Sequence, residues 1–213
     1  MAEFWPEILT SASWQRLQEL KKEIKNFTVI GGWAVYLWTG IHKSKDIDII
    51  VDLVTLDLLR QKYDLNKNMS LKKYEIKQEK FDIDIYVTYF SEFVMPVEDL
   101  IKDFTTNVQG FRVLVPEALL VLKQAAEIQR RGSVKGEKDV IDICTLLAKS
   151  GFSIKKYFEI LNKYRLERYA AELSRVVNEF DAKNSENISL SFKDFQKWRK
   201  GIAKELAMFK LNE

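Results

Sequence analysis

Aspartate occurs twice in the sequence as a pair separated by a single isoleucine. Asp46 and Asp48 form the first pair, and Asp82 and Asp84 form the second. Alternate side chains of a β-strand point to the same face, so each pair would present two carboxylates on Cα atoms about 7 Å apart. Carboxylate oxygens are the ligands that Mg²⁺ prefers, and protein-bound Mg²⁺ also binds phosphates. Two such strands side by side would therefore form a site for divalent metal and phosphate.

Carboxylates gathered in this way repel one another when no cation is bound, and each raises the pKa of the others. A divalent cation reverses this effect because it becomes the largest local charge. Two metal ions about 3.5–4 Å apart can hold the attacking and leaving oxygens of a phosphoryl displacement. The alternative is an edge strand with a solvated outer face, which explains one such pair better than it explains two.

A glycine pair, Gly31-Gly32, directly follows the short apolar run 27–30 and precedes a short helical pattern. Glycine lets a phosphate approach the backbone, and a helix N-terminus offers free N–H groups and a favourable dipole. A tight turn alone would also explain the two glycines. Because Asp46 follows after one short helix and a turn, the spacing favours a phosphate site beside the metal site.

The elements that must position these residues are predicted from the spacing of apolar residues. We expect strands at 27–30, 46–51, 72–78, 81–89 and 111–115, and helices at 6–25, 33–38, 53–63, 117–131, 138–149, 154–164, 166–180 and 192–209. Strands and helices mix before Pro116, whereas only helical patterns follow it. The sequence predicts an α+β catalytic core over residues 1–115 and an all-helical C-terminal domain over residues 116–213.

The composition narrows the classes of function. Apolar residues make up 46% of the 213 residues, which is enough for a buried core and argues against disorder. One cysteine, Cys144, and one histidine, His42, exclude an internal disulfide, a cysteine zinc cluster and a multi-histidine metal site. The chain starts without a signal-peptide pattern and has no apolar run long enough for a membrane span, so we expect a cytoplasmic protein without a membrane partner.

Taken together, these residues resemble the nucleotidyltransferase superfamily that includes DNA polymerase β. The pattern of that superfamily is an apolar residue with a glycine pair, a short helix, an Asp-apolar-Asp strand and a later carboxylate between apolar residues. Here it reads Ile30-Gly31-Gly32, Asp46-Ile47-Asp48-Ile49 and Ile83-Asp84-Ile85, and it covers about residues 27–90.

The resemblance implies a mixed sheet flanked by helices and Mg²⁺-dependent transfer of a nucleoside monophosphate from an NTP to an acceptor hydroxyl. It implies two metal ions, with Mn²⁺ as a substitute. Asp46 and Asp48 would bind the metals, and Asp84 would bind metal and help to deprotonate the acceptor. Gly31 and Gly32 would bind the nucleotide. Asp82 could take the third role, but Asp84 lies deeper in its apolar run and is preferred.

Within the superfamily, the chain is most similar to minimal and AbiEii-type enzymes, some of which are toxins of toxin–antitoxin pairs. That subgroup often has Arg-x-Thr/Ser-x-Asp-apolar-Asp. Ser44 matches this pattern and implies a contact with the nucleotide, whereas His42 stands in place of the arginine and Lys43 lies beside it as a further candidate. An antitoxin protein is accordingly a candidate partner.

The same subgroup carries a lysine and a later aspartate on helices after the core. Lys123 and Asp142 occupy similar places here, and the resemblance implies that Lys123 contacts the triphosphate. A lysine in an apolar helical run can also extend its ammonium group to solvent. Asp142 could equally pair with Lys123 or Arg131 as a purely structural link.

Two further readings remain beside the enzyme. The fold could serve as a non-catalytic module that binds a nucleotide or a protein partner. A metal-dependent phosphohydrolase could use the same acidic strands, although the presence of only one histidine and the Gly31-Gly32 turn disfavour it. The sequence leaves the acceptor open among RNA or a tRNA 3′ end, a protein hydroxyl and a small molecule.

Overall fold

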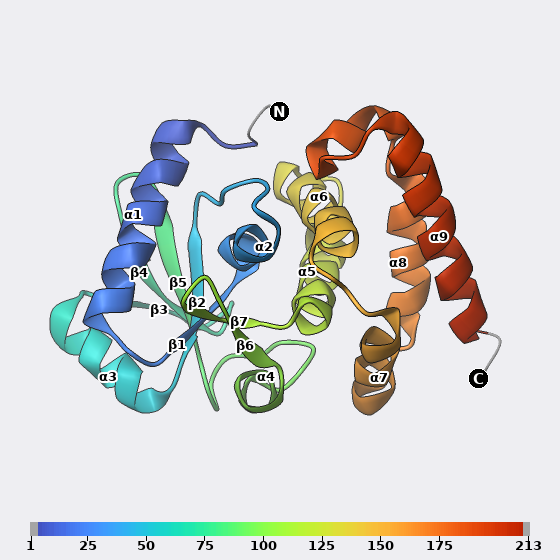
Figure 1. Ribbon diagram of the computed structural model, residues 1–213. Helices are drawn as coiled ribbons and strands as arrows, with labels where there is room; N and C mark the ends of the chain where they lie inside the picture. The colour runs from blue at the N-terminus through green and yellow to red at the C-terminus, as the bar shows by residue number, and fades with distance from the viewer. Residues whose placement is uncertain (1–3, 211–213) are drawn as a thin grey trace. The chain divides into compact units, whose positions relative to one another are not determined.

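The computed structural model describes residues 4–210, without the side chains of residues 209 and 210. The chain divides into two compact units, one that runs to Val115 and one that begins at Pro116. Figure 1 shows a sheet with flanking helices in the first unit and a group of helices in the second. The predicted α+β class, with a mixed sheet core followed by a helical C-terminal region, is confirmed.

The first unit alternates helices and strands along most of its length. In chain order its elements are α1 (Glu7–Glu23), β1 (Phe27–Ile30), α2 (Gly31–Thr39), β2 (Ile47–Val51), α3 (Leu53–Lys62), β3 (Asn66–Asn68), β4 (Lys73–Lys77), β5 (Asp82–Val87), α4 (Val97–Asp103), β6 (Thr105–Val108) and β7 (Phe111–Leu114).

The strands form one seven-stranded mixed sheet in the order β3-β4-β5-β2-β1-β7-β6. β2 pairs with β1 in antiparallel and with β5 in parallel orientation. Along β5, the side chains of Ile83, Ile85 and Val87 are buried, and the residues between them are partly exposed. This alternation packs the apolar face of the central strands into the core and leaves the acidic residues on the opposite face.

Helix α2 connects β1 to the loop before β2 and is fixed at several points. Trp33 is fully buried and its Nε1 donates a hydrogen bond to Ser13 Oγ of α1 at 2.8 Å. Trp38 Nε1 donates to the carbonyl oxygen of Leu114 at 2.9 Å. The helix ends at Gly40, whose φ of 69° is the left-handed conformation that commonly terminates helices. These contacts hold the start of α2 against α1 and its end against β7.

The second unit consists of helices in the part of the chain that the structure describes. They are α5 (Pro116–Arg130), α6 (Val134–Lys149), α7 (Ile154–Tyr164), α8 (Arg168–Glu179), the 3-10 helix η1 (Ala182–Ile188) and α9 (Phe192–Lys210). No helix among residues 4–210 has the length and apolar character needed to cross a membrane.

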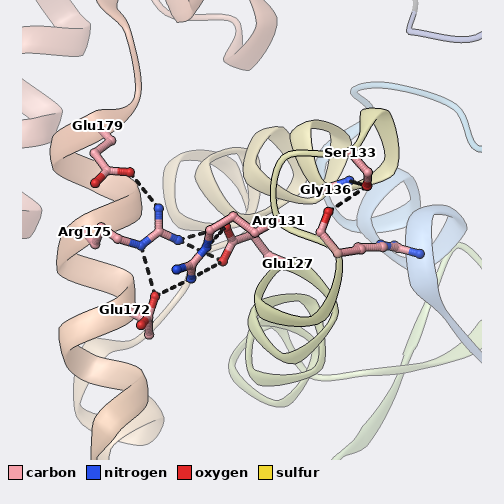
Figure 2. Close-up of polar contacts among 8 residues, drawn as sticks. Glu127, Arg131, Ser133, Gly136, Glu172, Arg175 and Glu179 are labelled. Carbon is pink, nitrogen blue, oxygen red and sulfur yellow. Dashed lines mark hydrogen bonds and ion pairs between the residues drawn. The ribbon is translucent and has the colours of Figure 1, made fainter.

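A polar network joins α5 to α8, as Figure 2 shows. Glu127 is buried and accepts hydrogen bonds from Arg131 at 2.9 Å and from Arg175 at 2.8 Å. Glu172 accepts a hydrogen bond from each of the same two arginines, at 2.6 and 3.0 Å. A buried carboxylate with two guanidinium partners has its acceptors satisfied, so the network fixes how these two helices pack.

Several predicted boundaries differ from the structure. α2 begins at Gly31 rather than at residue 33, so both glycines belong to the first turn of the helix. β2 begins at Ile47, and Asp46 lies just before it. The elements β3, α4 and β6 were not predicted, and η1 lies in a polar stretch expected only to separate two helices.

Candidate active site

Two of the predicted carboxylates occupy neighbouring positions in the sheet. β2 and β5 run parallel, and their register places Asp48 opposite Asp84. On its other side, Asp48 is paired with Ile30, the last residue of β1. Asp48 therefore lies between the strand that carries the third predicted carboxylate and the strand that leads into α2.

Asp46 does not belong to β2, contrary to the predicted strand 46–51. β1 ends at Ile30, and the chain then turns into α2, so β1 offers no residue to pair with Asp46. The side chain of Asp46 instead approaches β5, where its Oδ1 accepts a hydrogen bond from the backbone N–H of Asp82 at 3.3 Å. Its negative charge contributes to the raised pKa of Asp84. Asp46 thus remains close to the second Asp-x-Asp pair.

Asp84 is bound by a lysine that the sequence analysis did not single out. Lys73 Nζ lies 2.6 Å from Asp84 Oδ2 and 3.0 Å from Glu75 Oε1. Asp84 Oδ1 is buried and has no hydrogen-bond partner among the described residues. Burial raises the pKa of Asp84, the ammonium group of Lys73 opposes the rise, and the charges of Glu75 and Asp46 add to it. One oxygen of Asp84 is therefore held by a cation and the other is desolvated and unbound.

Asp82 has a different environment on the same strand. Its side chain is 39% exposed, against 17% for Asp84, and its Oδ2 lies 2.9 Å from Lys77 Nζ. Lys77 is itself half exposed and also contacts Glu75 at 3.2 Å. The sheet therefore places Asp84 deeper than Asp82, as the sequence analysis assumed, and directly beside Asp48.

The glycine pair packs against this acidic site. A Cβ atom added to Gly31 would lie 2.1 Å from Asp48 Oδ2, and Gly31 has a φ of +65°. A Cβ atom added to Gly32 would lie 2.6 Å from Ser44 Oγ. Ser44 Oγ in turn donates a hydrogen bond to the carbonyl oxygen of Asp46 at 3.0 Å. The first turn of α2, the loop before β2 and Asp48 are therefore in close contact, and only glycine fits at position 31 without a shift.

The donor set can be compared with the needs of a divalent cation. Among residues 4–210, no three His, Cys, Asp or Glu side chains are already gathered as a metal site. Oxygen donors of the kind that Mg²⁺ prefers are nevertheless present on Asp46, Asp48 and Asp84. Of these oxygens, Asp84 Oδ1 is buried and has no hydrogen-bond partner among the described residues. The residues fit a divalent cation in chemistry, and its binding stays a prediction.

Lys43 lies in the loop between α2 and β2 and is partly buried.

Lys123 and Asp142 belong to the second unit, where they form an ion pair of 2.7 Å between α5 and α6. Lys123 also contacts Asp139 at 3.1 Å, and Lys138 contacts Asp142. All four of these side chains are buried. The structural link considered for Asp142 and Lys123 is thus present, and a nucleotide contact of Lys123 stays a prediction.

The charge pattern of the strand before β5 is a sequence signal for Lys73. Lysine and glutamate alternate in Lys73-Tyr74-Glu75-Ile76-Lys77, and this strand precedes β5 by a tight turn. β4 and β5 pair in antiparallel register, with Glu75 opposite Asp84 and Lys77 opposite Asp82. A hairpin aligned on its turn residues would have placed the three charged residues of β4 beside the second aspartate pair.

No family model and no curated protein sequence matches the chain. Solved structures of nucleotidyltransferase-like proteins resemble it in fold. JHP933 from Helicobacter pylori has a TM-score of 0.51 and 15% sequence identity, over 96% of this chain and 98% of that chain. ANT(2″)-Ia, in complex with adenylyl-2″-tobramycin, has a TM-score of 0.50 and 13% identity, over 75% of this chain and 98% of that chain. At these identities the likeness establishes architecture: the chain has the nucleotidyltransferase fold.

Proposed function

We propose that the protein transfers a nucleoside monophosphate from an NTP to an acceptor hydroxyl and releases pyrophosphate. One observation carries this proposal. Within a nucleotidyltransferase fold, the sheet register sets Asp48 beside Asp84, and Gly31 packs against the Asp48 carboxylate. The residues that resemble the superfamily pattern are thus neighbours in the fold.

In the proposed reaction, the acceptor hydroxyl oxygen forms a bond to the α-phosphorus of the NTP. The bond from the α-phosphorus to the oxygen that bridges it to the β-phosphorus breaks, and pyrophosphate leaves with that electron pair. The proton of the hydroxyl passes to Asp84, whose Oδ1 is unbound. Mg²⁺ at Asp46, Asp48 and Asp84, or Mn²⁺ in its place, would neutralise the charge of the phosphates when bound.

The nucleotide would lie against the start of α2. Its first-turn N–H groups have no side-chain cap, and such groups favour a phosphate. Gly31 and Gly32 present bare backbone there, and Ser44 lies next to Gly32. Lys123 would contact the triphosphate only by leaving the carboxylates of Asp139 and Asp142, which it binds in the packing of α5 on α6.

Transfer from α-labelled NTPs tests the proposal. The purified protein is incubated with each NTP, with Mg²⁺ or with a chelator, and with acceptors of three classes: total tRNA, protein and tobramycin. Tobramycin is included because the complex of ANT(2″)-Ia contains its adenylylated form. We expect label in one acceptor and release of pyrophosphate only with Mg²⁺, and neither with Asp48→Asn. Calorimetry that gives equal NTP affinity with Mg²⁺ and with chelator would contradict the metal site.

A second candidate is a non-catalytic module that binds a nucleotide or a protein partner. Lys73 favours it, because its ammonium group already neutralises Asp84 without any metal. Pyrophosphate release separates the two candidates. The enzyme releases pyrophosphate with one of the acceptors, whereas a non-catalytic module binds NTP and releases none with any acceptor.

A role as the toxin of a toxin–antitoxin pair rests on the resemblance around Ser44. Induced expression in a bacterial host tests it. We expect growth arrest with the wild-type chain and normal growth with Asp48→Asn at the same protein level. Growth arrest by both chains would separate the effect from transfer and remove the toxin role.

A further inference from the structure

Lys73 occupies a position that the proposed function leaves unexplained. It lies on β4, which neighbours β5 in the sheet, and its ammonium group bridges Glu75 and Asp84. Only 10% of its side chain is exposed. A lysine in such a place loses most of its hydration and is retained only if its carboxylate partners compensate.

The sheet register explains why a cation is needed there. Glu75 on β4 is opposite Asp84 on β5, and Asp84 is opposite Asp48 on β2. Three carboxylate-bearing residues therefore occupy successive strands in one row. Lys73 Nζ contacts the first two of them, at 3.0 and 2.6 Å. The negative charge of this row is thus partly neutralised by the chain itself.

The geometry of Asp84 shows what this contact does to the carboxylate. Lys73 binds Oδ2 at 2.6 Å, whereas Oδ1 is buried without a hydrogen-bond partner in the part of the chain that the structure describes. A carboxylate with one oxygen fixed by a short charge-assisted contact cannot rotate freely. Its second oxygen stays available in one direction.

We propose that Lys73 is a positioning residue of the active site: it holds Asp84 by Oδ2, keeps Oδ1 unbound for the acceptor proton or a divalent cation, and is a tethered cation that competes with metal for Asp84. This inference rests on the proposed function. It adds to the proposed function a lysine of β4 that acts only through Asp84 and touches neither nucleotide nor acceptor.

Lys73→Met should change metal binding and transfer in opposite directions. Loss of the tethered cation frees Asp84 Oδ2 and removes a repulsive charge, so Mn²⁺ should bind about tenfold more tightly or more. Loss of the fixed carboxylate should slow transfer by about 10²-fold, with little change in the KM for NTP. A purely structural lysine would give weaker metal binding and slower transfer together.

Mn²⁺ binding is measured on the full chain by electron paramagnetic resonance, without NTP, and transfer is measured in a single turnover. Lys73→Arg retains the cation and should restore wild-type metal affinity and part of the transfer rate. Lys77→Met is the matched control, because Lys77 lies on the same strand and contacts Glu75 and Asp82 but not Asp84. It should change both quantities less than about twofold.

Weaker or unchanged Mn²⁺ binding by a folded Lys73→Met overturns the proposal even if transfer falls. A double-mutant cycle of Lys73→Met and Asp84→Asn, measured by unfolding in chelator, must also show coupling between the two residues. If the wild-type chain releases no pyrophosphate with Mg²⁺ and any NTP, the proposed function fails. Lys73 as a competitor of metal then stands only if Lys73→Met gains Mn²⁺ binding, and falls if it does not.

Discussion

Gly31 and Gly40 share a left-handed backbone conformation, with φ of 65° and 69°, but differ in their surroundings. A Cβ atom at Gly31 would lie within 3 Å of Asp48, whereas one at Gly40 would meet nothing within 4 Å. Alanine at Gly40 should cost roughly 1 kcal/mol for the backbone alone. Alanine at Gly31 adds a collision and should cost about 2–4 kcal/mol.

Gly31→Ala should also abolish transfer, because the Asp48 carboxylate must move to accommodate the methyl group. Gly40→Ala should retain transfer. Chemical denaturation gives the two free energies of unfolding, and the transfer assay gives the rates. Equal costs and equal rates for the two variants would show that Gly31 serves only the turn.

Asp84 and Asp82 lie on the same face of β5 but differ in exposure and in partner. We expect Asp84→Asn to reduce single-turnover transfer by on the order of 10²-fold or more, the usual contribution of a positioned base. Asp82→Asn should cost much less, since the more exposed Asp82 lies beside Lys77 at the start of the strand. Greater damage from Asp82→Asn would mean that Asp82 is the third carboxylate.

At the scale of elements, the central strands were predictable and the edge strands were not. β1 was predicted with its observed bounds because it is a buried apolar run, and the predicted strand 81–89 contains β5 because buried apolar residues alternate along it. β3 and β6 lie at the two edges of the sheet and have no fully buried residue. An edge strand such as Asn66-Lys67-Asn68 carries no apolar alternation, so hydrophobic periodicity cannot detect it.

The two boundary errors at the site have different physical origins. Asp46 was assigned to a strand from alternation alone, but on one side β1 has already ended at Ile30, and on the other the backbone N–H of Asp82 donates to the Asp46 side chain. Gly31 and Gly32 were assigned to a turn between the strand and the helix, because glycine suits tight turns. The first turn of a helix contributes carbonyl groups to the helix, so glycine is tolerated there. The boundary at Asp46 depends on neighbouring strands rather than on local sequence.

A buried group of charges between α5 and α6 supplies a prediction about pH. Asp142 has 1% of its side chain exposed and contacts the ammonium groups of Lys123 and Lys138. Burial alone would raise the pKa of Asp142, but the two lysines outweigh it and hold the pKa below the ordinary 3.8. A carboxyl with a lowered pKa stabilises the fold above its unfolded pKa, and this contribution is lost as the pH falls through the folded value.

Asp142→Asn should therefore destabilise the protein by about 3–5 kcal/mol at pH 7, the usual cost of removing one partner of a buried ion pair. The difference from wild type should stay constant down to about pH 5 and narrow below pH 3.8. Glu179→Gln is the control, because Glu179 is 63% exposed and pairs with Arg175 at 2.6 Å. Urea unfolding at several pH values measures the free energy of unfolding of both variants. If Asp142→Asn lowers it by the same amount at every pH, Asp142 does not stabilise the fold through its charge.

At the scale of the whole molecule, the sequence predicted the fold that carries the candidate catalytic residues, but not the complete arrangement of the site. The parallel register of β2 and β5 brings Asp48 and Asp84 together, as two neighbouring acidic strands required. Lys73 was missed, because its importance depends on which strand pairs with β5 and in what register. Pairing between strands is a property of the sheet, and apolar periodicity within one strand does not contain it.

A ligand bound at the proposed site stabilises the folded chain. The Asp46 carboxylate should therefore lower the stability of the chain without metal and raise it with Mg²⁺ and NTP. Without metal, its charge contributes to the raised pKa of Asp84, so it opposes folding at neutral pH. Asp46→Asn removes that charge but can still accept the hydrogen bond from the Asp82 N–H. In chelator we expect this variant to be as stable as wild type or more stable, by up to about 1 kcal/mol.

With Mg²⁺ and NTP the order should reverse. A ligand at a hundred times its dissociation constant stabilises the folded state by about 2.7 kcal/mol, and a variant that does not bind gains nothing. Thermal unfolding in chelator and in Mg²⁺ with NTP measures both conditions for wild type, Asp46→Asn and Asp57→Asn. Asp57 is an exposed acid on α3 and should leave both melting temperatures unchanged. If Asp46→Asn lowers the melting temperature in chelator, Asp46 stabilises the fold rather than binding a metal, and the assignment of Asp46 and Asp48 as metal ligands is wrong.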